Sequence, residues 1–99
     1  MLMSTHFILF NWTEQGIKAV KASPKRLSAA KRLAKDFGLK FRDFHMTMGQ
    51  YDGIATIEAP DDAAVARFAL ALGSAGNVRT TTLKGFTEQE YRKIIGSLP

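Results

Sequence analysis

The sequence contains no cysteine, which excludes disulfide bonds, thiolate metal sites and cysteine nucleophiles. It has no run close to the roughly 20 apolar residues of a transmembrane helix. Residues 1–12 (MLMSTHFILFNW) lack the basic segment and the longer apolar run of a signal peptide. At 99 residues, the chain can form one domain with a modest core, which oligomerisation would help to stabilise. We therefore expect a small cytoplasmic protein with no membrane association.

Acidic residues are scarce beside basic ones, and the formal net charge is +5. Much of the positive charge falls in one stretch that no acid interrupts before Asp36: Lys18, Lys21, Lys25, Arg26, Lys31, Arg32 and Lys35. Such a stretch is typical of a solvated helix face, although phosphate or nucleic acid could use the same charges. Ferredoxin-like sheets that bind RNA expose aromatic side chains on their central strands. Residues 51–57 (YDGIATI) have no such set, so we do not expect a nucleic-acid partner.

Residues 5–12 (THFILFNW) predict a strand with apolar side chains on both faces. One alternating set contains Phe7, Leu9 and Asn11, and the other contains His6, Ile8, Phe10 and Trp12. A strand that is apolar on both sides is buried on both faces of its sheet.

Capping and turn residues mark the other elements. Ser23 and Pro24 predict the N-cap and first position of a helix that ends at Gly38. Residues 39–48 and 51–59 alternate as two strands, which a hairpin turn at Gly49–Gln50 joins. The remaining elements are a helix capped by residues 60–62, a strand at residues 78–84, and a final helix opened by the capping box at residues 87–90.

The order of elements is strand, helix, strand, strand, helix, strand, helix. It predicts an α+β fold: a ferredoxin-like βαββαβ unit with a four-stranded antiparallel sheet and an additional C-terminal helix. The two crossover helices can cover only one face of this sheet. Because the first strand is apolar on both faces, we expect a second copy to pack sheet against sheet.

The stretch Gly49-Gln50-Tyr51-Asp52, preceded by Thr47-Met48, resembles the defining motif of the GYD-domain family. The similarity runs nearly end to end, through NWTEQGI (11–17), SPKR (23–26), EAPDD (58–62), ALALG (69–73) and GNVRT (76–80). The resemblance implies a single domain over residues 1–99 and a dimeric α+β barrel of two face-to-face sheets, but no established reaction. Gly53 departs from the branched apolar residue expected there, which predicts a looser strand or some space beside it.

A more distant similarity is to the effector-binding domain of the leucine-responsive and asparagine-responsive regulators. It rests on Gly49–Asp52, a following helix, and NVRTTT at residues 77–82. In those regulators the hairpin lies near the place where small effectors, often amino acids, bind between subunits. The present sequence has no helix-turn-helix part, so the resemblance implies only a sensing domain.

These patterns give a set of candidate ligand-binding residues. Tyr51 offers an aromatic ring with a hydroxyl group, and Asp52 can accept backbone amides across the hairpin or between subunits. The two can therefore fix the hairpin and the oligomer contact, or line a ligand pocket. Arg79 can pair with Asp52 or with a ligand carboxylate. The full candidate set is Asn11, Trp12, His45, Tyr51, Asp52, Arg79 and Thr81.

His45 is the candidate catalytic residue. If Phe44 and Met46 face the helices, alternation places Asp43, His45 and Thr47 on the opposite face, inside a barrel. A histidine near a carboxylate in such a space could act as a general base. We expect no metal site, because the other histidine, His6, lies on another strand, and we expect no cofactor.

The sequence thus favours a small homo-oligomeric protein that binds a small molecule at the barrel or subunit interface, or simply assembles. The alternative is a cofactor-independent dimeric-barrel enzyme, of monooxygenase or isomerase type, with His45 as its base.

Overall fold

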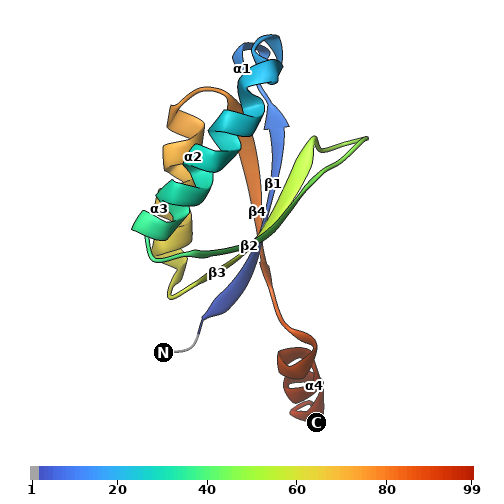
Figure 1. The fold of residues 1–99 in the computed structure, drawn as a ribbon. Helices are drawn as coiled ribbons and strands as arrows, with labels where there is room; N and C mark the ends of the chain where they lie inside the picture. Colours follow the sequence, from blue (N-terminus) through green and yellow to red (C-terminus); the bar gives the residue numbers. More distant parts are fainter. Residues whose placement is uncertain (1–2) are drawn as a thin grey trace.

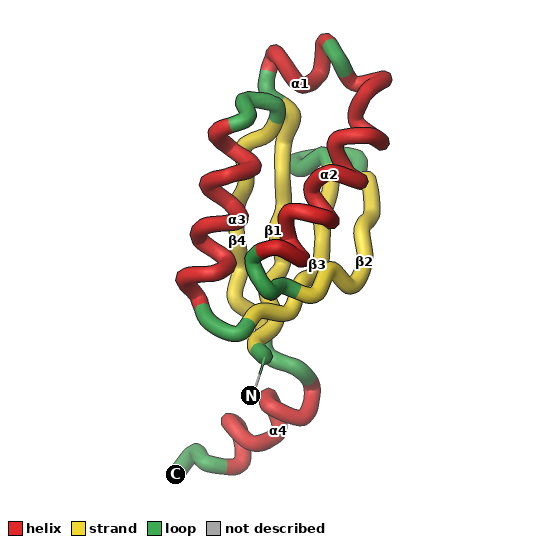
Figure 2. Tube along the Cα trace, turned by 60° about the vertical axis from the view of Figure 1, so that its left-hand side comes forward, coloured by secondary structure: helices red, strands yellow, loops and turns green. Residues whose placement is uncertain are grey.

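A four-stranded antiparallel sheet with the strand order β2-β3-β1-β4 forms the centre of the molecule (Figure 1). The computed structural model describes residues 3–99. Its strands are β1 (Ser4–Trp12), β2 (Lys40–Met46), β3 (Gly53–Ala59) and β4 (Val78–Gly85). Helices α2 (Ser23–Asp36) and α3 (Asp62–Ser74) lie together on one face of the sheet (Figure 2). The predicted α+β, ferredoxin-like arrangement is confirmed.

Three shorter elements complete the chain. Helix α1 (Glu14–Lys18) and a short 3-10 helix, η1 (Val20–Ala22), connect β1 to α2. Helix α4 (Glu88–Gly96) begins at the predicted capping box, follows β4 after two residues and extends away from the rest of the fold (Figure 1). Every residue of α4 is exposed, including Tyr91, Ile94 and Ile95 on its apolar stripe.

The core lies between the sheet and the two helices, on what we call the helix face. Its largest fully buried side chains are Phe68 of α3 and Ile57 of β3, and Ile8 of β1 packs with them. Burial alternates strictly along β3, which places every second residue under the helices. Asp61 caps α3 as predicted, accepting the backbone N–H of Ala64.

The opposite side of the sheet, the open face, has no helix over it among residues 3–99 (Figure 2). Cross-strand pairing places Phe7 beside Leu83 and Leu9 beside Ile54 and Thr81 on this face. Leu83 is 52% exposed, and Phe7 and Leu9 are half-buried. β1 is therefore apolar on both faces, as its sequence indicates, and the single chain covers only one of them.

A β-bulge corrects one predicted alternation. The register of β2 against β3 shifts between Phe41 and Asp43, so Phe41 packs with the core while Asp43 lies opposite Thr56 on the open face. Strict alternation along residues 39–48 would place Phe41 on the same face as Asp43 and His45. The extra residue at the bulge lets Phe41 and Phe44 share the helix face.

Two predicted boundaries were also wrong. Ser23 is not the N-cap of α2: it has helical φ and ψ because η1 runs directly into α2, and Ala22 occupies the cap position without a side-chain hydrogen bond. Tyr51 does not begin β3, which starts at Gly53, so residues 47–52 form a longer hairpin loop. Gly49 has a φ of 110° in this loop, which explains the glycine at that position.

Gly53 accommodates an aromatic ring. A Cβ atom at this position would lie 2.2 Å from Cε2 of Phe10, which is its partner across the β1–β3 pair. The Phe10 ring thus occupies the side-chain space over β3 and stacks on Phe44 of β2, with 5.9 Å between the ring centroids. The space predicted beside Gly53 is filled by Phe10.

Replacing Gly53 by alanine should lower the free energy of unfolding by about 1–3 kcal/mol, because the new methyl group must push the Phe10 ring aside. Gly73→Ala is the matched control. Gly73 lies in α3, and no atom is within 4 Å of the position that its new methyl group would take, so alanine should be neutral or stabilise by up to about 1 kcal/mol. Urea unfolding of the two variants tests this, and equal effects would contradict the packing of Phe10 over Gly53.

Candidate functional site

The seven candidate residues lie in three places within one chain. Asn11, His45, Arg79 and Thr81 are on the open face, Trp12 is on the helix face, and Tyr51 and Asp52 are in the hairpin loop. Adjacent residues of a strand point to opposite faces, which separates Trp12 from Asn11. A pocket that includes all seven stays a prediction and is not formed by a single chain.

Asp52 attaches the hairpin loop to the end of β1. Its backbone N–H donates to the Phe10 carbonyl oxygen at 2.8 Å, and its Oδ2 accepts the backbone N–H of Trp12 at 2.9 Å. The carboxylate thus takes the place that a backbone carbonyl would have if β3 continued along β1. Its side chain makes no ion pair with Arg79, which is exposed, within residues 3–99.

Other polar groups close the same loop. Thr47 Oγ1 donates to the Tyr51 carbonyl oxygen at 2.7 Å, and Asn11 Nδ2 donates to the Gln50 carbonyl oxygen at 2.9 Å. The Tyr51 side chain is half-buried. Within the chain, therefore, the polar residues of the hairpin sequence hold the loop against β1.

His45 is exposed on the open face, opposite Ile54. Asp43 is also exposed on this face, and neither side chain forms a hydrogen bond within the described part of the chain. A general base is usually oriented by a hydrogen-bond partner, and His45 has no such partner among these residues. Its role as a base remains a prediction.

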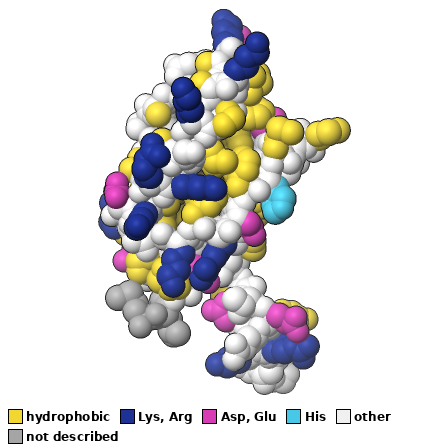
Figure 3. Space-filling model, in the orientation of Figure 1, with side chains coloured by type: hydrophobic (Ala, Val, Ile, Leu, Met, Phe, Trp, Pro, Cys, Tyr) yellow, Lys and Arg dark blue, Asp and Glu magenta, His cyan; other side chains and the backbone are white. Residues whose placement is uncertain are grey.

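A concave site lies on the helix face, between α2 and the sheet. It is a cleft of about 490 Å³ with an almost entirely apolar lining. Its side chains come from every strand and from both α2 and α3, and include Phe10, Trp12, Leu27, Leu33, Phe41, Phe44, Met46 and Leu72. Figure 3 shows hydrophobic surface beside a row of basic side chains on this side of the molecule.

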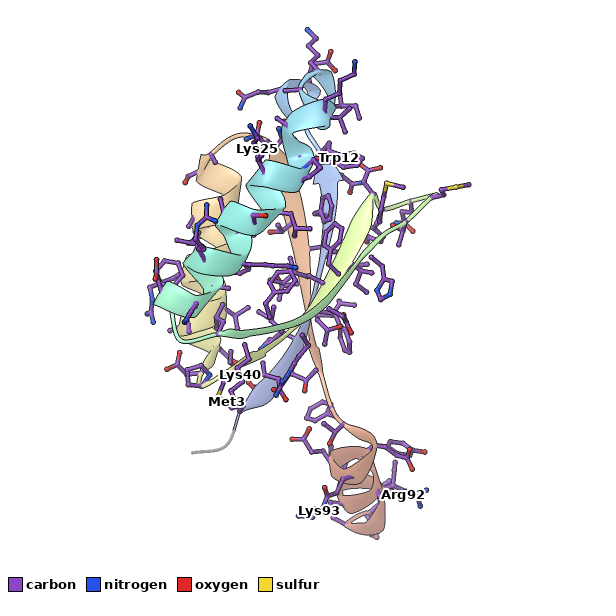
Figure 4. All side chains as sticks on the ribbon, viewed as in Figure 1. Met3, Trp12, Lys25, Lys40, Arg92 and Lys93 are labelled. Atoms are coloured by element: carbon purple, nitrogen blue, oxygen red, sulfur yellow. The ribbon has the colours of Figure 1, made fainter. Side chains whose placement is uncertain are left out.

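Three aromatic rings form a row in the cleft. The Trp12 and Phe10 rings meet edge to face at 5.7 Å, and Phe10 stacks on Phe44 at 5.9 Å. Trp12 lies at the end of β1 beside the first turns of α2 (Figure 4). Such a row offers flat apolar surface to a ligand.

The charged groups at the cleft are basic. Arg26 is among the lining residues, and its guanidinium donates to the carbonyl oxygens of Ala19 at 3.0 Å and Gly16 at 3.2 Å. Lys31 Nζ lies 5.5 Å from the centroid of the Phe41 ring. No histidine, aspartate or glutamate is among the described residues that line the cleft.

Sequence reasoning placed the site on the other face and missed this cleft. The available signals were the apolar set of His6, Ile8, Phe10 and Trp12, which points away from the open face, and the SPKR stretch that begins α2. The sequence pattern does not show the space between α2 and the sheet, because that space depends on how the helix packs.

The sequence analysis also did not predict a polar cluster of His6, Asp62 and Lys84. His6 is only 3% exposed; its Nε2 lies 3.4 Å from Asp62 Oδ1, and its Nδ1 has no hydrogen-bond partner among the described residues. Lys84 Nζ lies 3.2 Å from the same Asp62 oxygen, and this hydrogen bond and charge lower the pKa of Asp62, with a smaller effect from His6. A shallow groove beside α3 adjoins the cluster.

The described residues contain no group of three histidine, aspartate or glutamate side chains placed to hold a metal ion. Likewise, no helix within residues 3–99 has the length and apolar character needed to cross a membrane.

Comparison with known proteins adds three findings. The GYD domain family matches residues 7–95. A Thermus thermophilus protein named glutamine synthetase and cystathionine beta-lyase binding protein is 35% identical over 83 residues, which cover 83% of this chain and 87% of that protein. The crystal structure of MtbAldR superposes with a TM-score of 0.66 at 15% identity over 88% of this chain, which spans 55% of that protein. The last similarity concerns the fold alone.

Replacing Asp52 by alanine should lower the free energy of unfolding by about 1.5–3 kcal/mol, because the Trp12 N–H loses a charged acceptor. Asp52→Asn should cost less, since an amide oxygen can still accept. Urea unfolding at neutral pH measures both. Asp36→Ala, at the exposed end of α2, is the control and should change little. An Asp52→Ala variant as stable as the control would show that the loop does not depend on this hydrogen bond.

Proposed function

Because the chain belongs to the GYD domain family and has an apolar cleft under α2, we propose that it is a homo-oligomeric binding protein for a small molecule with a large apolar part. The observation that carries the proposal is the cleft itself. Its volume of about 490 Å³ falls within the roughly 300–1,000 Å³ of typical small-molecule sites, and its lining is apolar and aromatic, as such sites are.

The chemistry of the lining favours binding over catalysis. General acid–base catalysis needs a titratable group within hydrogen-bond reach of the reacting atom. Among the described residues, the lining offers Arg26, which stays charged, but no histidine or carboxylate. His45, the candidate base of the enzyme alternative, lies on the other side of the sheet.

Self-association is the second part of the proposal. The chain has an accessible surface of 6934 Å², whereas a compact monomer of 10.9 kDa has about 5,600 Å². Its radius of gyration is 14.8 Å, against about 12.6 Å for a compact domain of this length. The open face and the extended helix α4 both contribute to this surface, and both carry exposed apolar side chains that a second copy would bury.

In this arrangement two open faces pack together and form the dimeric α+β barrel that the family resemblance implies. Asn11, His45, Arg79 and Thr81 then lie between the two sheets, so we propose them as interface residues. The Thermus thermophilus relative is named for binding two enzymes. A protein partner on the same surfaces is the competing possibility, and the mass of the purified protein alone separates the two.

Light scattering at low micromolar concentration should give a mass that is a multiple of 10.9 kDa. Leu9→Glu should shift the mass to that of the monomer, because it places a charge in the proposed interface, which we expect to bury about 2,000 Å² or more. Leu70→Glu is the control, since Leu70 is 73% exposed on α3 and lies away from the open face. A folded wild-type species of 10.9 kDa would rule out self-association.

The neutral fluorescent probe phenylnaphthylamine should bind the cleft and receive energy from Trp12, the only tryptophan. Ala30→Leu adds bulk to the lining and should weaken binding about tenfold, the equivalent of roughly 1.4 kcal/mol of overpacking. The control is Ala63→Leu, an exposed position of α3 outside the cleft. Binding without energy transfer, or binding that both variants affect equally, would place the probe elsewhere.

A further inference from the structure

We propose that the ligand of the cleft is an anionic amphiphile, an organic acid with an apolar body, and that Arg26 binds its carboxylate. This inference rests on the ligand-binding cleft proposed above. It names the chemical class of the ligand and a residue that recognises it.

Arg26 carries a positive charge that no acid balances. A guanidinium has five N–H donors, and this one contacts the carbonyl oxygens of Ala19 and Gly16, both of which are neutral. No carboxylate lies within ion-pair distance of Arg26 in residues 3–99, although the side chain is half-buried. A partly buried cation without a counter-ion is stabilised by an anion that completes the site.

The Arg26 side chain is also held in place. Its two carbonyl contacts belong to the connection between β1 and α2, one in α1 and one just before η1. A guanidinium fixed in this way loses little entropy when it binds a ligand. Its remaining donors can form a bidentate pair with a carboxylate.

The charge around the cleft has the same sign. Lys31 lies about 7.5 Å further along α2 than Arg26, at the rise of an α-helix, and its ammonium group is over the ring of Phe41. The whole of α2 before Asp36 has basic residues and no acid. The basic residues of α2 therefore favour the approach of anions to this side of the cleft.

The aromatic row distinguishes one class of anion from another. Inorganic phosphate and sulfate would gain from the charge but would leave the rings of Trp12, Phe10 and Phe44 without an occupant. A neutral hydrocarbon would pack on the three rings but would leave the charge of Arg26 without a counter-ion. An aliphatic or aromatic carboxylic acid satisfies both, with its apolar body on the rings and its head at Arg26.

Two fluorescent probes that share one aromatic skeleton test the proposal. Anilinonaphthalene sulfonate carries an anionic group, and phenylnaphthylamine is its neutral counterpart. With the full-length protein, energy transfer from Trp12 should show tighter binding of the charged probe. Arg26→Gln should weaken the charged probe about tenfold more than it weakens the neutral probe. Arg26→Lys should keep most of the preference, because it retains the charge. Lys35→Gln, at the end of α2 outside the cleft, is the charge-matched control and should have little effect.

Competition on the wild-type protein provides a readout without mutation. Octanoate should displace the neutral probe at a lower concentration than octanol, which has the same chain length and no charge. If neither probe receives energy from Trp12, the cleft-binding proposal fails and this inference with it. If the neutral probe binds in the cleft but octanoate is no better than octanol, or Arg26→Gln weakens both probes equally, cleft binding stands and the anionic ligand is overturned.

Discussion

The central strand β1 is apolar on both of its faces, and this constraint shapes the rest of the molecule. Ile8 and Phe10 point to the helices, while Phe7 and Leu9 point to the open face. Each such side chain gains about 1.5–3 kcal/mol from full burial, which is large beside the stability of a small domain. The helices bury the apolar side chains of one face. Those of the other face are buried only if another surface packs on it. In the proposed function, binding and assembly are therefore divided between the two sides of one strand.

The sequence was sufficient for the elements and their order because these depend on local chemistry. Alternation identified the strands, Asp61 and Thr87 marked helix starts, and Gly38 and Gly49 have the positive φ angles that their positions required. Two features depended instead on contacts between separate segments. They are the bulge that turns Phe41 inward and the hydrogen bond by which the Asp52 side chain continues the pairing of the hairpin with β1.

The candidate site was harder to predict for a related reason. The hairpin motif indicated Tyr51 and Asp52 as site residues, but in the structure the Asp52 side chain accepts a hydrogen bond from the Trp12 backbone. The cleft has no motif, because it arises from the distance at which α2 packs on the sheet. Its basic rim was visible as the charge stretch of α2, which the sequence alone assigns to a solvated face. Only the structure shows that Arg26 lines the cleft together with Trp12 and Val20.

The hydrogen bond between Asp52 and the Trp12 N–H has a consequence for communication within the protein. The Trp12 ring lines the cleft, its backbone is tied to the hairpin loop, and its neighbour Asn11 holds the same loop from the open face. If a ligand of the cleft shifted the end of β1, it would act through two hydrogen bonds on a loop at the border of both faces. If the bound and free states differ in the position of the loop, occupancy of the cleft and affinity between copies become thermodynamically linked, and each must alter the other by the same factor.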